Sequence, residues 1–280
     1  MTKLNPRIEK GFVCLTIGLA KKVLIANQVH YLSDYIFLYD GHDTITALTG
    51  LLSFGVEIYF DFSGYTDIAL GLGLILGIQL PQNFRSPFRA KSMRDYWRRW
   101  HMTLSDWFRD YMYIPLGGNR KGKAREVFNI AFVMITCGFW HGAKWNYLIW
   151  GSLMAIYFIL EKVLFSDTFK NSKDYPFITM SYIFLLWLPF RATDLGQIQR
   201  YLYNIFNWAE FENIQILEMI LWQHAIALIG GLFIIFKVKR TQQWIEDLSP
   251  KLFGGFVVLF LYVVTEAFSD NYRPFIYFDF

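Results

Sequence analysis

Hydrophobic residues occur along this chain in long continuous runs, not in the alternating pattern of half-buried strands. The clearest runs are residues 127–143, 145–165, 176–190, 214–236 and 252–268. Shorter or interrupted runs cover residues 11–29, 45–60 and 65–80, the first of them broken by Lys21 and Lys22. A helix needs about 20 mostly apolar residues to cross a bilayer, so the pattern predicts roughly seven to nine membrane helices. Because lipid admits only helices or closed barrels as spanning segments, we expect an all-α polytopic membrane protein.

The composition agrees with a membrane protein and differs from that of an ordinary soluble domain. Hydrophobic residues make up 54% of the 280 residues and charged residues only 18%, against about 25% charged in typical globular chains. Cys14 and Cys137 both lie in apolar runs, so we expect small buried side chains rather than a disulfide framework. No repeat or low-complexity linker divides the chain, and we interpret residues 1–280 as a single membrane domain.

Between these runs, residues 93–112 combine many aromatic side chains with many charges. Spacings of three and four place the following apolar residues on one face of a single helix: Met93, Tyr96, Trp97, Trp100, Leu104, Trp107, Phe108 and Tyr111. Asp95 and Arg99, and likewise Asp106 and Arg109, have the spacing of ion pairs on that helix. We expect the helix to lie at the membrane interface or to enter the protein as a re-entrant element.

Positive charge is concentrated in one part of the chain. Residues 81–125 carry eleven lysines and arginines but only three aspartates, whereas the whole chain has a net charge of +4. A basic excess between spans indicates the cytoplasmic side. The basic segment could face anionic lipid headgroups, or form the mouth of a site for a phosphate-bearing substrate. Tryptophans at helical spacing between membrane segments argue against nucleic-acid binding, and no nucleic-acid partner is expected.

Three carboxylates, those of Glu57, Asp61 and Asp67, interrupt an otherwise apolar stretch. Ionisable groups at membrane depth are costly and usually face a partner or a cavity. We expect a structural role for Asp61 and Asp67 through pairing with the basic segment that follows. The next stretch, GLGLILG at residues 71–77, lacks the strand and turn of a phosphate-binding loop, so its glycines are expected to pack helices closely.

Two histidines stand among tryptophans, His101 in WRRWH and His141 in GFWHGAKWNYLIWG. A histidine at membrane depth should be neutral and able to accept a proton, as a general base for an alcohol must. A purely structural histidine is equally compatible with this pattern. Cys137 could join both histidines as a metal ligand, but the chain has no HExxH motif and no second cysteine pair, so no metal is expected. Without a GxSxG motif, a serine hydrolase is not supported.

Three long stretches resemble the membrane-bound O-acyltransferase (MBOAT) family, in its bacterial AlgI-like branch of alginate O-acetyltransferases. They are IYFDFSGYTDIALGLGLILG, DYWRRWHMTLSDWFRDYMYIPLGGNRKG and GFWHGAKWNYLIWG, and the likeness extends to the C-terminal FIYFDF. The resemblance implies a ring of transmembrane helices, with re-entrant or interfacial helices, around a central cavity. Relatives in this branch are usually longer, so we expect this chain to lack the family's N-terminal spans.

The resemblance also implies a site and a reaction. His141 corresponds to the histidine regarded as catalytic in the family, and His101 to the histidine of the second motif. The residues expected to bind substrate or donor are Trp97, Arg98, Trp100, Arg109, Trp140, Trp145 and Asn146. The implied protein is a multi-pass protein of the bacterial inner membrane that transfers an acyl group, usually acetyl, from a cytosolic donor such as acetyl-CoA. No further cofactor is expected.

The implied acceptor is an extracytoplasmic polysaccharide, either an alginate-like exopolysaccharide or peptidoglycan, reached directly or through a periplasmic acetyltransferase partner. Two other classes of protein stay open. A transporter for an acyl or sugar substrate would also need intramembrane carboxylates, and a truncated, inactive scaffold would fit a chain without the full ring of helices. Thioester cleavage by the purified protein distinguishes an enzyme from a transporter. Co-purification with a periplasmic transferase while His101 and His141 are dispensable would favour the scaffold.

Overall fold

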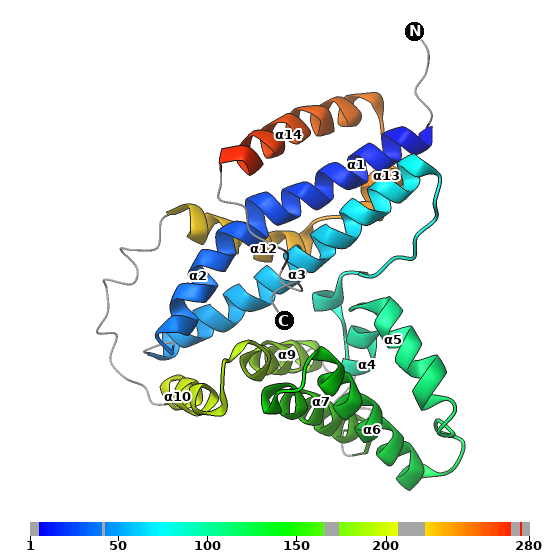
Figure 1. The fold of residues 1–280 in the computed structure, drawn as a ribbon, viewed down its shortest axis with the longest axis vertical. Coiled ribbons are helices and arrows are strands. Elements are labelled where there is room, and N and C mark those ends of the chain that lie inside the picture. The colour runs from blue at the N-terminus through cyan, green and yellow to red at the C-terminus, as the bar shows by residue number, and fades with distance from the viewer. Residues whose placement is uncertain are drawn as a thin grey trace. The chain divides into compact units, whose positions relative to one another are not determined.

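The computed structural model describes residues 6–40, 43–163, 165, 174–206, 222–269 and 275. All regular elements over these residues are helical, which confirms the predicted all-α class (Figure 1). The chain divides into two compact units. The first unit comprises Met1–Ile36, Leu52–Asn83 and Phe211–Phe280, and the second comprises Phe37–Leu51 and Phe84–Glu210.

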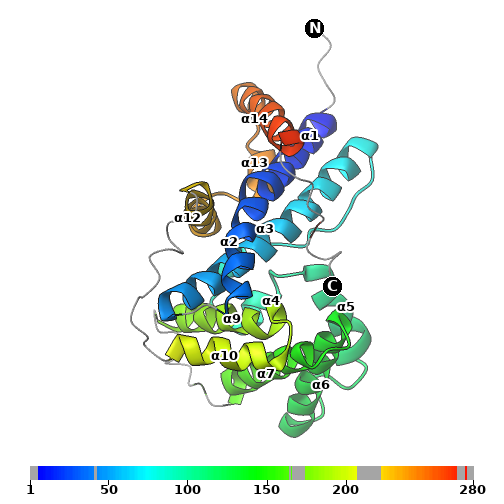
Figure 2. The same ribbon diagram turned by 60° about the vertical axis from the view of Figure 1, so that its left-hand side comes forward.

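The first unit is built from long helices that pack side by side. In chain order they are α1 (Pro6–Ala20), the π-helical turn η1 (Lys21–Ala26), α2 (Asn27–Leu38), α3 (Thr44–Leu76), α12 (Trp222–Lys237), α13 (Thr241–Glu246) and α14 (Pro250–Ser269). Helix α3 begins in the second unit and continues into the first. Helix α1 packs against α13 and α14, and Figures 1 and 2 both show α14 alongside α1.

Three helices in the described part are long and apolar enough to cross a membrane by length and composition: Arg7–Leu38, Thr44–Leu76 and Pro250–Phe268. The first contains the run predicted at residues 11–29, and Lys21 and Lys22 do not interrupt it. The runs predicted at residues 45–60 and 65–80 are joined in one helix, α3, which ends at Leu76. Glycines are tolerated inside this helix because neighbouring backbones pack onto them.

Two buried ion pairs explain how lysines fit into the first long helix. The Nζ atom of Lys21 lies 2.5 Å from Oδ2 of Asp67, and Nζ of Lys22 lies 2.5 Å from Oδ1 of Asp61. The hydroxyl of Thr241 in α13 donates to the same Asp67 oxygen at 2.7 Å. Asp61 and Asp67 therefore pair with cations of the first helix, whereas the sequence favoured partners in the basic segment. A buried charge is stable only when such a partner compensates its desolvation.

Helices α1 and α3 approach each other closely at paired glycines. A Cβ atom on Gly18 would lie 2.7 Å from the backbone oxygen of Gly64, and one on Gly11 would lie 2.7 Å from that of Gly71. Only residues without a side chain allow backbones to come this close. The helix-packing role predicted for the GLGLILG glycines is thus confirmed for Gly71.

The second unit carries the predicted site residues other than Asp61 and Asp67. Its helices are η2 (Pro87–Arg89), α4 (Met93–Trp97), α5 (Met102–Phe108), η3 (Arg109–Tyr113), α6 (Lys123–His141), α7 (Trp145–Val163), α9 (Tyr175–Arg191) and α10 (Leu195–Phe206). Helix α7 packs along α6 and also contacts α4 and α9. Helices α6, α7 and α9 coincide with the runs predicted at residues 127–143, 145–165 and 176–190. The run at 214–236 lies partly outside the described residues.

Residues 93–112 do not form the single helix that their periodicity predicts. Helix α4 ends at Trp97 and α5 begins at Met102, and His101 between them has a left-handed backbone with φ 42°. The buried Trp100 ring packs on Tyr96 and Trp187 at centroid distances of 5.7 and 5.2 Å. These tertiary contacts stabilise a turn where the local pattern alone favours helix. The ion pairs predicted for Asp95–Arg99 and Asp106–Arg109 are both present, at 2.7 and 2.6 Å.

Candidate functional site

The turn between α4 and α5 brings His101 next to the C-terminal end of α6. The rings of His101 and Trp140 have a centroid distance of 6.2 Å, and those of Trp140 and His141 a distance of 5.0 Å. His101 and His141 are also close enough for the charge on one to influence the other. The fold of the second unit therefore joins two histidines from separate sequence motifs into one cluster.

Aromatic rings from α7 and α9 surround His141. Its ring lies 5.3 Å from that of Trp150 and 5.1 Å from that of Phe190, measured between centroids. Directly after His141 the chain turns at Gly142, whose φ of 154° and tight contact with the Tyr147 ring leave no room for a Cβ atom. These contacts restrict the orientation of the His141 ring, as a site for directed proton transfer requires.

His101 is held in its neutral form. Burial lowers the pKa of His101 to about 4, because the charged imidazolium would lose its hydration. Each nitrogen of a neutral imidazole serves either as a donor or as an acceptor. Its left-handed backbone is uncommon for a residue other than glycine, and such strain persists where the surrounding structure fixes it.

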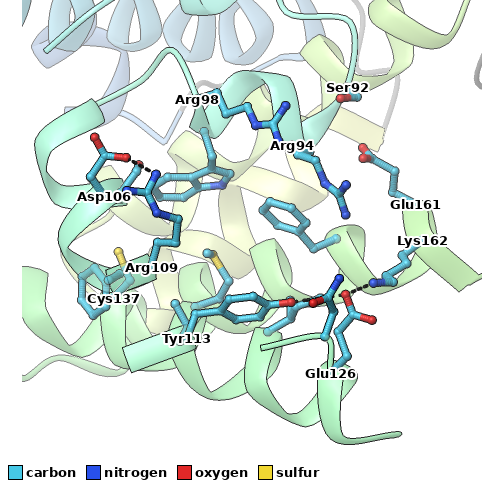
Figure 3. A pocket seen from close by; sticks show the side chains of 18 of the residues that line it. Ser92, Arg94, Arg98, Asp106, Arg109, Tyr113, Glu126, Cys137, Glu161 and Lys162 are labelled. Carbon is cyan, nitrogen blue, oxygen red and sulfur yellow. Dashed lines mark hydrogen bonds and ion pairs between the residues drawn. The ribbon is translucent and has the colours of Figure 1, made fainter. Parts of the chain in front are cut away.

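The second unit also contains a cavity of about 810 Å³, lined by residues of α4, α5, η3, α6 and α7 (Figure 3). This volume falls in the range of small-molecule sites. Its apolar lining consists of Trp97, Met102, Phe108, Ile130, Val133, Met134, Cys137 and Phe158. Met102 directly follows His101, and Cys137 lies one helical turn before His141. The cavity wall and the histidine cluster thus share the same two chain segments.

Charged groups gather on the polar side of the cavity. The cations are Lys91, Arg94, Arg98, Arg109 and Lys162, and the carboxylates are Asp106, Glu126 and Glu161. The buried Glu161 accepts a hydrogen bond from the backbone N–H of Met93 at 2.7 Å, which fixes the start of α4 on α7. Lys162 pairs with Glu126, and the hydroxyl of Tyr113 donates to the same carboxylate at 3.2 Å. Positive charge is in excess.

Among the residues predicted to bind substrate or donor, Trp97, Arg98 and Arg109 line this cavity. Trp140 stands against both histidines, and its side chain is exposed. Trp145 is also exposed. Neither of these two tryptophans lines the cavity.

Two further predicted residues are placed by packing and hydrogen bonding. Trp100 is buried in the aromatic cluster described above. The buried side-chain amide of Asn146 donates to the carbonyl of Ala192 at 2.6 Å and so ties the start of α7 to the end of α9. Neither residue reaches the cavity.

The sequence did not single out Tyr113, Glu126, Glu161 or Lys162, which complete the polar side of the cavity. Three of them carry a signal that could have been used. Glu126 stands at the edge of the run at residues 127–143, and Glu161 and Lys162 lie inside the run at 145–165. Ionisable residues within apolar runs usually have a partner or face a cavity.

Comparison with known proteins assigns the chain to a family. Residues 2–183 match the model of the membrane-bound O-acyltransferase family. A probable alginate O-acetylase AlgI of Pseudomonas putida is 31% identical over 98% of this chain and 61% of its own length. A peptidoglycan O-acetyltransferase of Helicobacter pylori is 41% identical over 69% of this chain and 38% of its own length.

A teichoic acid D-alanyltransferase of Streptococcus thermophilus is 39% identical over 39% of this chain and 28% of its own length. The chain thus spans 61% or less of the length of each of these three relatives. The matched residues 2–183 include both histidine motifs and every residue that lines the cavity. The chain is a membrane protein of all-α fold and belongs to the membrane-bound O-acyltransferase family.

Proposed function

We propose that this chain carries the reaction centre of an O-acyltransferase, in which His141 is the general base and His101 assists it. The supporting observation is the cluster of His101, Trp140 and His141, held by aromatic rings in the same unit as a basic cavity. A neutral imidazole can remove the proton from an alcohol. The neutral state of His101 makes it suitable to donate one hydrogen bond to a reacting oxygen.

The reaction transfers an acyl group from a thioester to a hydroxyl. His141 takes the hydroxyl proton, the oxygen attacks the thioester carbonyl, and the carbon–sulfur bond breaks after a tetrahedral intermediate. The proton on His141 then passes to the leaving thiolate. His101 stabilises the oxyanion of the intermediate. The apolar surroundings limit hydrolysis of the thioester, and no cofactor is needed beyond the thioester co-substrate.

The family and the named relatives support a choice of substrates. These relatives act on alginate, peptidoglycan or teichoic acid according to their names. For this chain we propose acetyl-CoA or a similar cytosolic thioester as the donor, and hydroxyls of an extracytoplasmic polysaccharide as the acceptor. The acyl group reaches this final acceptor directly or through a periplasmic acetyltransferase partner. The chain then belongs in the bacterial inner membrane with several spans.

The test replaces His141 by Ala or Gln in the native host and measures alkali-labile acyl groups on the envelope polysaccharide. Loss of a general base should lower acylation at least about 100-fold at equal protein level. Lys144→Ala, an exposed neighbour on the same connection, is the matched control and should leave acylation unchanged. Undiminished acylation in the His141 variants at normal protein level would refute the assignment. Polysaccharide acylation without thioester cleavage by the purified protein would favour a transporter or scaffold.

A further inference from the structure

The basic residues that line the cavity fall into two groups, according to whether a carboxylate neutralises them. Arg109 donates to Asp106 at 2.6 Å and to Asp110 at 2.7 Å, and Lys162 pairs with Glu126. Lys91, Arg94 and Arg98 differ, since their side chains make no hydrogen bond or ion pair with any residue that the structure describes.

The three cations without an ion pair form one positive strip along the cavity. Arg94 belongs to α4, Arg98 caps its C-terminal end one turn later, and Lys91 precedes Arg94 by three residues. Figure 3 shows Arg94 and Arg98 reaching into the cavity from one side, with Glu126 and Lys162 on the other. Asp95 forms its ion pair with Arg99 and not with the strip, although the charge of Arg98 also acts on its carboxylate.

The charge of Arg94 also acts across the cavity. Burial raises the pKa of Tyr113, and the positive charge of Arg94 opposes that rise. The same charge influences Lys162, a second cation on the opposite wall. Like charges that face each other across a cavity repel, and an anion between them relieves this repulsion. The electrostatics of the cavity therefore favour an anionic ligand on the polar side.

The rest of the lining is largely apolar, and neither His101 nor His141 is part of it. Trp97 is buried there, and its indole N–H has no hydrogen-bond partner among the described residues. Met102 and Cys137 line the same cavity and connect it in sequence to His101 and His141. A ligand that fits both parts carries phosphate at one end and a long neutral chain at the other.

We propose that Lys91, Arg94 and Arg98 bind the phosphate groups of a nucleotide-type thioester donor, whose neutral arm extends along the apolar wall toward the histidines. The proposal rests on the proposed function for the thioester itself. A guanidinium binds phosphate through two parallel charge-assisted hydrogen bonds, which makes arginine suited to this role. Arg94 and Lys91 thus join Arg98 as donor contacts, and the neutralised Arg109 is not one of them.

The test measures binding of coenzyme A, which lacks the acyl group, to the purified full chain in neutral detergent. Arg94→Ala combined with Arg98→Ala should weaken binding at least about ten-fold, since two charge-assisted contacts are lost. Arg120→Ala combined with Lys121→Ala removes the same charge from the exposed loop after η3, and should change affinity less than about two-fold at physiological salt. Lysine in place of both Arg94 and Arg98 should restore part of the affinity.

Two controls separate the phosphate contacts from other causes. Pantetheine, which has no phosphate, should bind the wild type and the Arg94→Ala, Arg98→Ala variant equally. Equal affinity of both proteins for coenzyme A would overturn the proposal. Nanodiscs with and without phosphatidylglycerol test the other source of phosphate. If the two arginines retain this lipid and have no effect on coenzyme A, the strip is a lipid-headgroup site and the proposal is wrong.

Failure of this proposal can be told apart from failure of the proposed function, because binding needs no chemistry. His141→Ala should bind coenzyme A with wild-type affinity. If the Arg94→Ala, Arg98→Ala variant loses coenzyme A binding while acyl transfer persists in His141→Ala, the phosphate subsite is supported. The assignment of His141 as general base is then wrong. If acyl transfer depends on His141 but coenzyme A affinity is the same with and without the two arginines, the proposed phosphate subsite is wrong. The role of His141 as general base is then retained.

Discussion

The two units of this chain use charged residues in opposite ways. In the first unit, Lys21 and Lys22 are matched by Asp67 and Asp61 at 2.5 Å, and all four side chains are largely buried. In the second unit, Arg94 and Arg98 line a cavity, and neither forms an ion pair with a carboxylate in the described part of the chain. The first arrangement is complete in the protein alone, whereas the second leaves positive charge for a ligand to neutralise.

This difference shows that a charge in an apolar region does not by itself identify a binding site. Asp61 and Asp67 are conspicuous in the sequence because they interrupt an apolar stretch, yet their partners lie within the fold. Arg94 and Arg98 are two of many basic residues in their segment. A structural charge has an ion-pair partner within the fold, whereas a charge available to a substrate has none. Only the three-dimensional structure shows which of the two applies. Substitutions in the two units should therefore affect different properties.

The largest effect is expected from Asp61→Asn, which removes the carboxylate charge that pairs with the buried Lys22. Breaking a buried ion pair leaves an uncompensated charge, and the free energy of unfolding should fall by about 3–5 kcal/mol. The measurement is the thermal loss of helical circular dichroism in detergent. Replacing both residues, with Lys22→Met and Asp61→Leu, should recover most of the loss. An unchanged melting temperature in Asp61→Asn would show that this pair does not hold the first unit together.

A smaller effect is expected from protonation of His101. Its folded-state pKa of about 4 lies below the usual value of 6.5. Between these values the unfolded chain binds a proton that the folded chain does not, so stability is lost as pH falls from 6.5 toward 4. We expect the free energy of unfolding to fall by about 1–2 kcal/mol over this pH range, after allowance for the partial exposure of His101. Melting temperatures of the wild type and His101→Gln across this range measure it, and the variant should show the weaker pH dependence. Parallel curves would contradict it.

The sequence alone predicted the helical membrane class, because runs of apolar residues have few alternatives in lipid. It did not predict which helix supplies partners to Asp61 and Asp67. Periodicity gives the face of a helix on which a residue lies but not the helix that crosses there. The same limit applies at His101, where the pattern of residues 93–112 favoured one helix. The burial of Trp100 among distant rings such as Trp187 stabilises a turn instead.

The sequence predicted some residues of the candidate site but not which of its arginines are neutralised. Resemblance to a family singled out His101 and His141, and Trp97, Arg98 and Arg109 were named for their motif. Local sequence does not show whether an arginine is neutralised, because Asp106 precedes Arg109 by three residues just as Asp95 precedes Arg98. In the structure Asp95 forms its ion pair with Arg99, and the charge of Arg98 acts on it without an ion pair.

The smallest effect should come from Arg109→Ala, and it sharpens the contrast between compensated and uncompensated cations. The hydrogen bond with Asp110 raises the pKa of Arg109 and lowers that of Asp110, as expected for a mutually neutralising pair. Exposed pairs of this kind contribute little, so coenzyme A affinity should fall less than about two-fold. Asp106→Asn combined with Asp110→Asn should have the opposite sign and strengthen binding, because Arg109 then becomes available to phosphate. If Arg109→Ala instead weakens binding as much as Arg94→Ala, neutralisation by carboxylates does not decide which cations of this cavity contact the donor.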